Sequence, residues 1–524
     1  MPMLPMASCE RGSTSTETSK EVAATPAGAA AYPFAIVKRP DPRKSLKRPK
    51  AILFIIIDTL RADHLGCYGS TLGLTPNLDS IAKYSIVFEN AMATSSWTRA
   101  SVASMYTSRY PTSNGCLTRE DLLAEDAVTL AEELARLGGY KCIGIYGNGN
   151  AGWDMGFDQG FMWYRTPPIH EQRKYESDPP DALKFPADSI TRHALKALQQ
   201  KSEGNYRDRP VMLVTHYVDP HDPYLPHPGL LNEPEPAGRW SGSRTNLLEM
   251  DRMSHALTEM DKERIRFLYR GEVKYCDAAV GELLHNLSAI MDLAKDTMIV
   301  VTSDHGEGLW DHGFRDHGTD LFEEQVRVPL LIHWPGMTAN DARIISEPVS
   351  LVDIAPTILA AAGLDSPPEF QGADLSPWRT APPLSPKNGF VFTEMNLDEK
   401  NFEALRSARY KLVRNRSMEL GASRSFQLFD LVSDPKEMVN LLETSGDLQP
   451  EAAKVLEQHQ ELLWTWSSAV LEAAGDEVER KHLDLAELDP TTLQLLRGLG
   501  YISATEFENA KQSSNKSKGS GDGK

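Results

Sequence analysis

In the segment Ala51-Ile-Leu-Phe-Ile-Ile-Ile-Asp58, an apolar run rich in β-branched residues ends abruptly in a carboxylate. Two later apolar runs end in the same way, one at His216 and one at the pair Asp304-His305. Short runs without alternation are typical of strands that are buried on both faces of a parallel sheet. Ligands of open α/β sheets bind beyond the carboxyl ends of the strands. We therefore expect these side chains to share one site.

The order of the elements indicates a doubly wound fold. Residues 46–375 alternate strand-like runs with longer helical patterns, including further strands at 140–145 and 328–334 and helices at 262–293 and 351–362. This alternation predicts a three-layer α/β/α architecture with a mostly parallel central sheet. Residues 166–190 and 225–260 are Pro-rich, charged and aperiodic, and we expect them to form walls that select the substrate.

The character of the chain changes near residues 377–386. We predict a disordered leader or tether at 1–47, a catalytic α/β domain at 48–376 and a small α+β domain at 377–480. Strands at 409–413 and 426–431 and a helix at 451–466 belong to this small domain. A helical extension at 481–503 is followed by a polar tail at 504–524, which lacks the apolar residues to form a core and is expected to be disordered.

Charge and composition exclude several classes of protein. The 524 residues carry a formal net charge of −18, which argues against binding to nucleic acid or to an anionic membrane. No apolar run approaches the ~18 residues that span a bilayer. The residues before Cys9 resemble the end of a bacterial lipoprotein signal without its basic and apolar regions. Two locations stay open: extracytoplasmic (periplasmic or anchored by lipid at Cys9), or soluble in the cytoplasm.

A series of ordered motifs resembles the sulfatase family. The motifs are Ile55-Ile-Ile-Asp-Thr-Leu-Arg-Ala-Asp-His-Leu-Gly-Cys-Tyr-Gly69, Ser95-Ser-Trp-Thr-Arg-Ala-Ser-Val-Ala-Ser-Met-Tyr-Thr-Ser-Arg-Tyr-Pro111, His216-Tyr-Val-Asp-Pro-His-Asp-Pro-Tyr224, Ser303-Asp-His-Gly-Glu-Gly308, His312-Gly-Phe-Arg-Asp-His-Gly318 and Leu321-Phe-Glu-Glu-Gln-Val-Arg-Val-Pro329. Arg409-Tyr-Lys-Leu412 and Leu428-Phe-Asp-Leu-Val-Ser-Asp-Pro-Lys-Glu437 extend the likeness into the second domain. The resemblance implies an alkaline-phosphatase-like fold and hydrolysis of an ester at a metal-bound nucleophile.

The nucleophile position departs from the family pattern. The resemblance places Thr98 where sulfatases carry a Cys or Ser that is oxidised to formylglycine, and Ala100 and Val102 replace the proline and arginine of that signature. Threonine is a secondary alcohol, so its oxidation would give a ketone, and the hydrated-aldehyde mechanism is unavailable. Phosphodiesterases and phosphotransferases of the same superfamily use a threonine alkoxide on a metal. We therefore expect hydrolysis of a phosphate monoester or diester, or of a phosphonate ester, through a covalent Thr98 intermediate.

The ligand set that the resemblance implies also departs from that of sulfatases. Thr59 replaces the second of two adjacent aspartates, and a later pair is Asp304-His305. The expected ligands are Asp58, Thr98, Asp304 and His305. Imidazole suits zinc or manganese, whereas calcium favours shells made of oxygen alone. We expect one divalent ion, zinc or manganese, with calcium and magnesium as alternatives.

Several further side chains are candidates for proton transfer or substrate binding. His221, His317 and His216 are the expected partners of the ester oxygens. His216 is also a candidate for a second metal site together with Asp219, His312 and His317, so one ion and two ions both stay open. Asn148 lies in the segment that replaces the sulfate-clamping Gly-Lys-Trp-His element of many sulfatases.

Three functions stay open. The first is the threonine-dependent hydrolase, acting on a small-molecule, saccharide or lipid-headgroup ester. The second is a sulfuric ester hydrolase that works without formylglycine. The third is an inactive sulfatase-like domain that binds a polysaccharide or a partner; the retained carboxylates and histidines argue against it, because buried charges without a metal are costly.

Overall fold

The apolar run that opens the sequence forms strand β1 (Ala51–Ile57), all of whose residues are buried, in a computed structural model of the chain. β1 lies between β6 (Val211–Tyr217) and β7 (Thr297–Thr302) and is parallel to both. Ile56 is in register with His216 and with Thr302. The carboxyl ends of these three strands therefore lie together at one edge of the sheet, as predicted.

These strands form the centre of an eight-stranded sheet with the order β12-β2-β11-β7-β1-β6-β4-β5. Strand β11 is antiparallel to its neighbours β2 and β7, and the other pairings are parallel. The predicted mostly parallel sheet is thus confirmed. The remaining strands are β2 (Ile86–Phe88), β4 (Lys141–Tyr146), β5 (Trp163–Arg165), β11 (Leu330–His333) and β12 (Arg343–Ile345).

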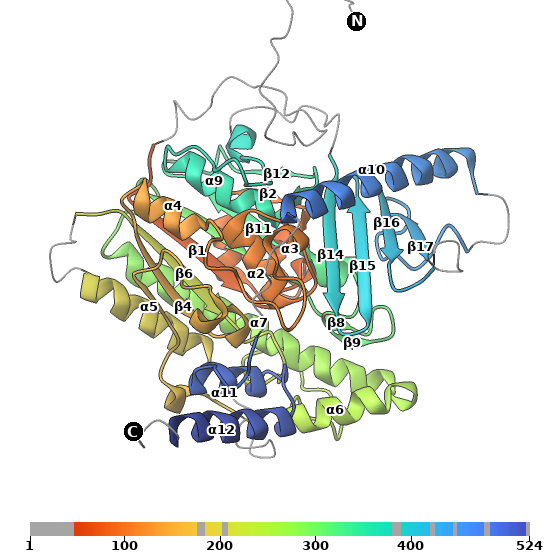
Figure 1. The fold of residues 1–524 in the computed structure, drawn as a ribbon, viewed down its shortest axis with the longest axis horizontal. Coiled ribbons are helices and arrows are strands. Elements are labelled where there is room, and N and C mark those ends of the chain that lie inside the picture. Colours follow the sequence, from red (N-terminus) through yellow and green to blue (C-terminus); the bar gives the residue numbers. More distant parts are fainter. Residues whose placement is uncertain are drawn as a thin grey trace, which may run out of the picture. The chain divides into compact units, whose positions relative to one another are not determined.

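Helices cover both faces of this sheet (Figure 1). Ile52, Phe54 and Ile56 belong to a core shared with α2 (Thr98–Thr107), α4 (Leu130–Arg136) and α9 (Ile354–Ala361). Leu53 and Ile55 belong to a second core shared with α1 (Pro76–Ala82), α5 (Ala187–Lys201) and α7 (Glu259–Ser288). Alternate residues of one strand thus feed two cores, and the three-layer α/β/α architecture is confirmed.

A small antiparallel sheet follows, with the strand order β14-β15-β16-β17. Its strands are β14 (Val391–Leu397), β15 (Lys400–Arg406), β16 (Tyr410–Asn415) and β17 (Phe426–Asp430), and helix α10 (Pro450–Ala474) packs on them. Trp466 of α10 stacks on Phe392 at 4.7 Å and meets Tyr110 edge-on at 5.2 Å, which ties the sheet to the first domain. The predicted small C-terminal α+β domain is confirmed.

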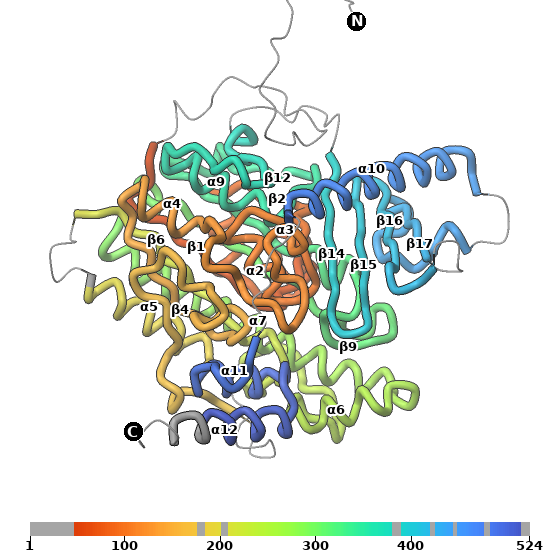
Figure 2. Tube along the Cα trace, in the orientation of Figure 1, coloured from red at the N-terminus to blue at the C-terminus, as the bar shows by residue number. Residues whose placement is uncertain are grey.

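Two helices end the chain, α11 (Pro490–Gly498) and α12 (Ala504–Gly519), drawn in the darkest blue in Figure 2. The sequence predicts a disordered tail from residue 504, whereas the structure has helix α12 there. Ser503 and Glu506 form reciprocal side-chain to backbone hydrogen bonds at the start of α12, and Phe507 and Ala510, one turn apart, are buried. A capping box and one apolar pair therefore suffice for a helix here.

Short elements complete the architecture: β3 (Ala91–Met92), α3 (Pro111–Asn114), α6 (Arg244–Arg252), β8 (Gly308–Leu309), β9 (Arg315–Asp316), α8 (Glu323–Val326), β10 (Arg327–Val328) and β13 (Val349–Ser350).

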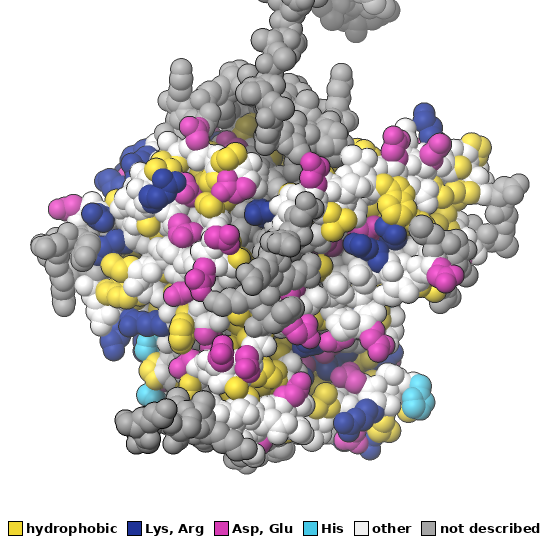
Figure 3. Space-filling model, in the orientation of Figure 1, with side chains coloured by type: hydrophobic (Ala, Val, Ile, Leu, Met, Phe, Trp, Pro, Cys, Tyr) yellow, Lys and Arg dark blue, Asp and Glu magenta, His cyan; other side chains and the backbone are white. Residues whose placement is uncertain are grey.

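The structure describes residues 47–174, 184–201, 208–379, 389–419, 425–443, 448–475 and 483–519. The predicted leader with Cys9, part of the 166–190 loop and part of the domain boundary near 377–386 lie outside these residues. No described helix is long and apolar enough to cross a bilayer. Figure 3 shows acidic and basic side chains interspersed over one face.

The junction between the two domains predicts a pH-dependent stability. Glu394 of β14 is buried and accepts hydrogen bonds from the Thr112 backbone N–H and hydroxyl, at 2.7 and 2.5 Å. Burial raises the pKa of Glu394 to about 7. Between its unfolded pKa of ~4.3 and this folded value, the folded state binds more protons than the unfolded state, so stability falls as pH rises.

Glu394→Gln cannot ionise and should not show this loss. Its free energy of unfolding, relative to that of the wild type, should rise by up to about 3 kcal/mol between pH 4.5 and pH 8. Denaturation curves at several pH values measure the difference, with the exposed Glu399→Gln as the control. A constant difference across this range would contradict the prediction.

Candidate active site

Two carboxylates and an imidazole meet at the carboxyl ends of the central strands. Asp58 follows β1, Asp304 follows β7, and His216 is the second-last residue of β6. His216 Nε2 is 3.4 Å from Asp58 Oδ2 and 3.9 Å from Asp304 Oδ2. One ligand atom from each of the three residues lies within 4.8 Å of the others, and all three side chains are buried. The strand ends thus assemble one polar centre.

Several atoms of this centre lack hydrogen-bond partners among the described residues. They are Asp58 Oδ1, Asp304 Oδ2 and both ring nitrogens of His216. Buried charged groups without partners are costly, and a bound cation removes that cost. His305 Nε2, at 3.7 Å from Asp58 Oδ1 and 3.5 Å from Asp304 Oδ2, adds a further donor. The donor set fits a divalent cation, and it includes His216, which the sequence suggests for proton transfer or for a second metal site but not for this one.

Thr98 is the first residue of helix α2, and its hydroxyl faces this centre. Thr98 Oγ1 lies 3.2 Å from His305 Nε2 and accepts a hydrogen bond from Asn148 Nδ2 at 3.2 Å. Asn148 Nδ2 also donates to Asp58 Oδ2 at 2.6 Å. The N-cap of α2 is the extended residue Trp97. The Thr98 hydroxyl is therefore not used to cap the helix, and it lies beside the carboxylates as the predicted nucleophile requires.

Neighbouring hydroxyls and one strained turn hold the loops that carry these groups. Ser101 Oγ of α2 donates to the Asp304 carbonyl at 2.6 Å, and Ser303 Oγ donates to the His305 carbonyl at 2.6 Å. Thr59 has a φ of 56°, a costly conformation for a β-branched residue. Its backbone N–H lies 3.4 Å from Asp304 Oδ1, while its hydroxyl donates to the Asp58 carbonyl. Thr59 thus contributes its backbone to the centre.

His221 and His317 form a second part of the site. Their rings lie 4.7 Å apart, and the His317 ring lies 4.5 Å from that of His305. Burial alone would lower the pKa of His317, but the carboxylates of Glu307 and Asp316 raise it to about 10. Burial also opposes protonation of His221, whose pKa is nevertheless raised by the Tyr501 oxygen and by nearby aspartates. Both rings are therefore suited to bind negatively charged oxygens.

Tyr501 is a site residue that the sequence did not indicate. Its hydroxyl oxygen lies 2.9 Å from His221 Nε2 and 3.1 Å from Thr98 Oγ1. It comes from the C-terminal extension, directly after Gly500 and helix α11. The only signal in the sequence was the short amphipathic pattern that ends at this tyrosine. Glu307 and Asp222, which support the two histidines, lie inside motifs already noted.

The chain matches the sulfatase family model over residues 50–364 and a second model, described as N-sulphoglucosamine sulphohydrolase, C-terminal, over residues 310–464. The chain belongs to the sulfatase family. The predicted family is thus confirmed, and with it the prediction of an ester hydrolase. This chain is 25% identical over 413 residues to the ulvan-active sulfatase of Formosa agariphila, and the match covers 75% of this chain and 76% of the relative. It is 26% identical to the N-acetylglucosamine-6-O-sulfatase of Bacteroides thetaiotaomicron, with coverage of 80% and 87%.

Solved structures confirm the sulfatase fold. A 2-O GAG sulfatase superposes with a TM-score of 0.64 at 20% identity, covering 85% of this chain and 96% of the other. The phosphonate monoester hydrolase of Agrobacterium radiobacter superposes with a TM-score of 0.62 at 22% identity, covering 80% and 96%. The same fold therefore occurs in proteins named for sulfate esters and for phosphonate esters.

The four residues named for a second ion are not brought together. His216 joins Asp58 and Asp304, while His317 lies with Glu307 and Asp316 in a separate group that could hold a metal. His312 pairs with Glu324 at 2.7 Å and stacks on Phe322. Asp219 accepts a hydrogen bond from the Ala187 backbone N–H at the start of α5. His312 and Asp219 thus belong to neither of the two groups that could hold a metal.

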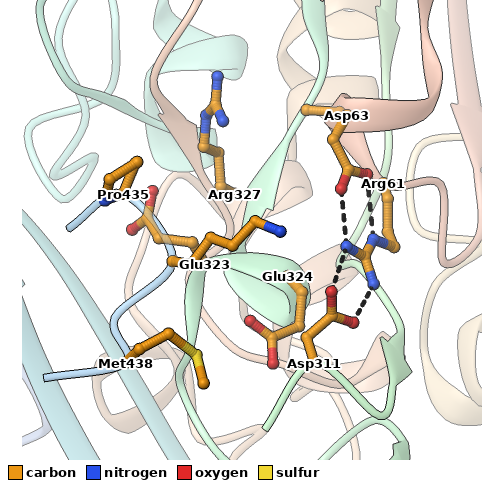
Figure 4. Close-up of a pocket in the computed structure, with 10 residues that line it drawn as sticks. Arg61, Asp63, Asp311, Glu323, Glu324, Arg327, Pro435 and Met438 are labelled. Atoms are coloured by element: carbon orange, nitrogen blue, oxygen red, sulfur yellow. Dashed lines mark hydrogen bonds and ion pairs between the residues drawn. The ribbon is translucent and has the colours of Figure 1, made fainter. Parts of the chain in front are cut away.

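A charged cavity of about 310 Å³ lies where Arg61 and Asp311 face the second domain (Figure 4). Arg61 lies between Asp63 and Asp311, with N–O distances of 2.7 and 2.6 Å. Glu323, also in its wall, lies near Arg406 at 3.2 Å and Lys411 at 3.3 Å. Asp63 is thus an ion-pair partner of Arg61 in the sulfatase motif that contains both residues.

A buried ion pair anchors the loop that carries His221. Lys184 Nζ lies 2.6 Å from Glu272 Oε1, with both side chains 0% exposed, and it also donates to the carbonyls of Asp219 and His221. Lys184→Met would leave the Glu272 carboxylate buried without its cation. We expect a loss of about 3 kcal/mol in the free energy of unfolding, measured by urea denaturation.

The matched control for this prediction is Lys50→Met. Lys50 pairs with Asp296 at 2.8 Å, but its side chain is 76% exposed, so the loss should be much smaller than that of Lys184→Met. Equal losses in the two variants would contradict the role given to Lys184.

Proposed function

We propose that this sulfatase-family hydrolase cleaves phosphate monoesters or diesters, or phosphonate esters, with Thr98 as a covalent nucleophile. One observation carries the proposal: Thr98 Oγ1 lies 3.2 Å from His305 Nε2, beside the Asp58 and Asp304 carboxylates that have oxygens without hydrogen-bond partners. A buried hydroxyl at such a position is suited to attack rather than to capping.

We assign Asp58, Asp304, His216 and His305 as ligands of one divalent cation, with Thr98 Oγ1 next to them. Two imidazoles among the donors favour zinc or manganese over calcium. A cation bound there would lower the pKa of the Thr98 hydroxyl and so supply an alkoxide near neutral pH. Asn148, which donates to both Asp58 and Thr98, orients the hydroxyl toward the substrate.

The proposed reaction has two steps, and further residues bind the ester during them. Thr98 Oγ1 forms a bond to phosphorus while the bond to the departing alcohol breaks, and water then hydrolyses the phosphothreonine. Because Thr98 is the first residue of α2, the positive end of the helix dipole lies next to its hydroxyl and favours an anion. His221 and His317 bind the non-bridging oxygens or the oxygen of the departing alcohol, because their pKa values are raised and the Nε2 atoms of both rings lie near the Tyr501 hydroxyl, which is 3.1 Å from Thr98 Oγ1.

The choice of phosphorus over sulfur rests on the side chain at position 98. A threonine cannot form the aldehyde on which the family's sulfate chemistry depends. Sulfuric ester hydrolysis without formylglycine is the second candidate, and the curated relatives named as sulfatases support it. An inactive binding domain is disfavoured, because it would keep buried carboxylate oxygens without partners.

Assays with aryl phosphate, aryl phosphodiester, aryl phosphonate and aryl sulfate separate these functions. We expect turnover of a phosphorus ester at a kcat/KM well above that for the sulfate. Turnover of aryl sulfate alone would instead support the second candidate.

Thr98→Ala should lower kcat for the preferred ester by at least about 10⁴-fold, because the covalent route is lost. Thr98→Ser keeps a hydroxyl and should retain measurable turnover. Thr107 lies at the far end of the same helix and donates to the Ala103 carbonyl, so Thr107→Ser is the control and should stay within a few-fold of the wild type. A fully active Thr98→Ala variant would remove Thr98 from the mechanism.

Removal of divalent ions should abolish turnover and lower the melting temperature, because the Asp58 and Asp304 carboxylates would then repel each other. Zinc or manganese should restore both quantities. Elemental analysis of the purified wild type and of Asp304→Asn checks the assignment, with ion content expected to fall in the variant. Full turnover by metal-free protein would refute it.

A further inference from the structure

We propose that Tyr501 is a catalytic residue, whose hydroxyl contacts an oxygen of the ester that Thr98 attacks. This inference rests on the proposed function and adds a residue from the C-terminal extension to the same site. The residues involved come from distant parts of the chain, since Thr98 begins α2 and Tyr501 follows α11.

The hydroxyl of Tyr501 occupies a position on which four polar groups converge. It lies 3.1 Å from Thr98 Oγ1 and 2.9 Å from His221 Nε2, and more distantly 3.4 Å from Asn148 Nδ2 and 3.5 Å from His317 Nε2. Groups that surround one oxygen in this way form an oxygen-binding position. Because Thr98 is assigned to attack the ester and His221 and His317 to bind its oxygens, this position lies within the substrate site.

The backbone on both sides of Tyr501 is held in place. Arg244 of α6 donates to the Leu499 carbonyl at 3.1 Å and to the Gly500 carbonyl at 3.3 Å. Arg119 donates to the Tyr501 carbonyl at 3.2 Å and pairs with Asp398. The bonds from Arg244 place the residues that follow α11 beside α6 (Figure 1).

Helix α11 is also packed against the loop that carries Asn148. A Cβ atom at Gly149 would lie 3.0 Å from Leu495 Cβ and 3.1 Å from the Thr492 carbonyl, so the two segments are in direct contact. Leu495 and Leu496 are buried, and Thr492 Oγ1 donates to Asp154 at 2.7 Å. The C-terminal segment is therefore a wall of the site with a fixed position relative to Asn148.

Because the backbone around Tyr501 is held in place, its hydroxyl stays within reach of a bound substrate. A phosphorus or sulfur atom poised for attack lies about 3–3.5 Å from Thr98 Oγ1, within the space next to the Tyr501 hydroxyl. The ester must displace that hydroxyl from Thr98, but the anchored backbone keeps the ring beside the site. The hydroxyl can then donate a hydrogen bond to an ester oxygen, between His221 and His317, where negative charge develops.

Tyr501→Phe tests this role, because it removes the hydroxyl and keeps the ring that packs against His221. We expect kcat for the preferred ester to fall about 10²-fold, the size of effect found when one donor to a developing negative charge is removed. The matched control is Tyr140→Phe, whose hydroxyl donates to the Pro49 carbonyl, in the loops at the opposite ends of the strands, and should leave kcat unchanged. Melting curves check that both variants fold.

The opposite role would be a plug, in which the hydroxyl only blocks the nucleophile. Tyr501→Phe would then turn over the ester at an equal or higher rate, and this outcome would overturn the proposal.

Binding of orthovanadate and inorganic phosphate, measured by calorimetry on protein with its divalent ion content determined, is independent of turnover. We expect Tyr501→Phe to weaken binding of at least one anion by about 10-fold relative to the wild type and to Tyr140→Phe. If no ester is hydrolysed but this loss is seen, the proposed function fails and the assignment of Tyr501 to an anion site stands. Equal or tighter binding in Tyr501→Phe, or no binding of either anion by the wild type, would overturn the assignment.

Discussion

The constraint on which the site depends is the placement of two carboxylates, Asp58 and Asp304, at the ends of adjacent parallel strands with oxygens that no described residue satisfies. Buried charges of one sign repel each other and are poorly solvated, so their retention needs a compensating positive charge. The sheet supplies the positions, and the nearby imidazoles supply partial compensation. The proposed role of the Thr98 hydroxyl depends on this centre, which lies beside it.

The two layers of helices serve this constraint in different ways. Helix α2 places Thr98 at its first position, and its Ser101 binds the loop that carries Asp304. On the other face, Glu272 of α7 and Lys184 form the buried pair that fixes the loop with His221. Covalent chemistry at Thr98 would thus be performed by a few side chains whose geometry is set by contacts in both cores.

Much of the fold could be predicted from the sequence, because β1, β6 and β7 are apolar runs whose pattern has few other interpretations. The polar residues that follow these runs could be assigned to one site for the same reason. The choice between the roles of His216 could not be made, because its distances to the two carboxylates depend on how the parallel strands are aligned. Strands β14 and β15 are interrupted by polar residues and left no clear pattern. Tyr501 could not be found, since only the folded chain brings it to Thr98.

The distance along the chain between Asp58 and Tyr501 has a consequence for biosynthesis. A ribosome-bound chain can complete the central sheet and the antiparallel sheet while the residues after α10 are still being made. The carboxylates proposed to bind the metal would already be in position, but one wall of the site would be missing. A nascent or proteolytically shortened molecule would therefore leave Thr98 open to water, and the site would be complete only when the final helices dock.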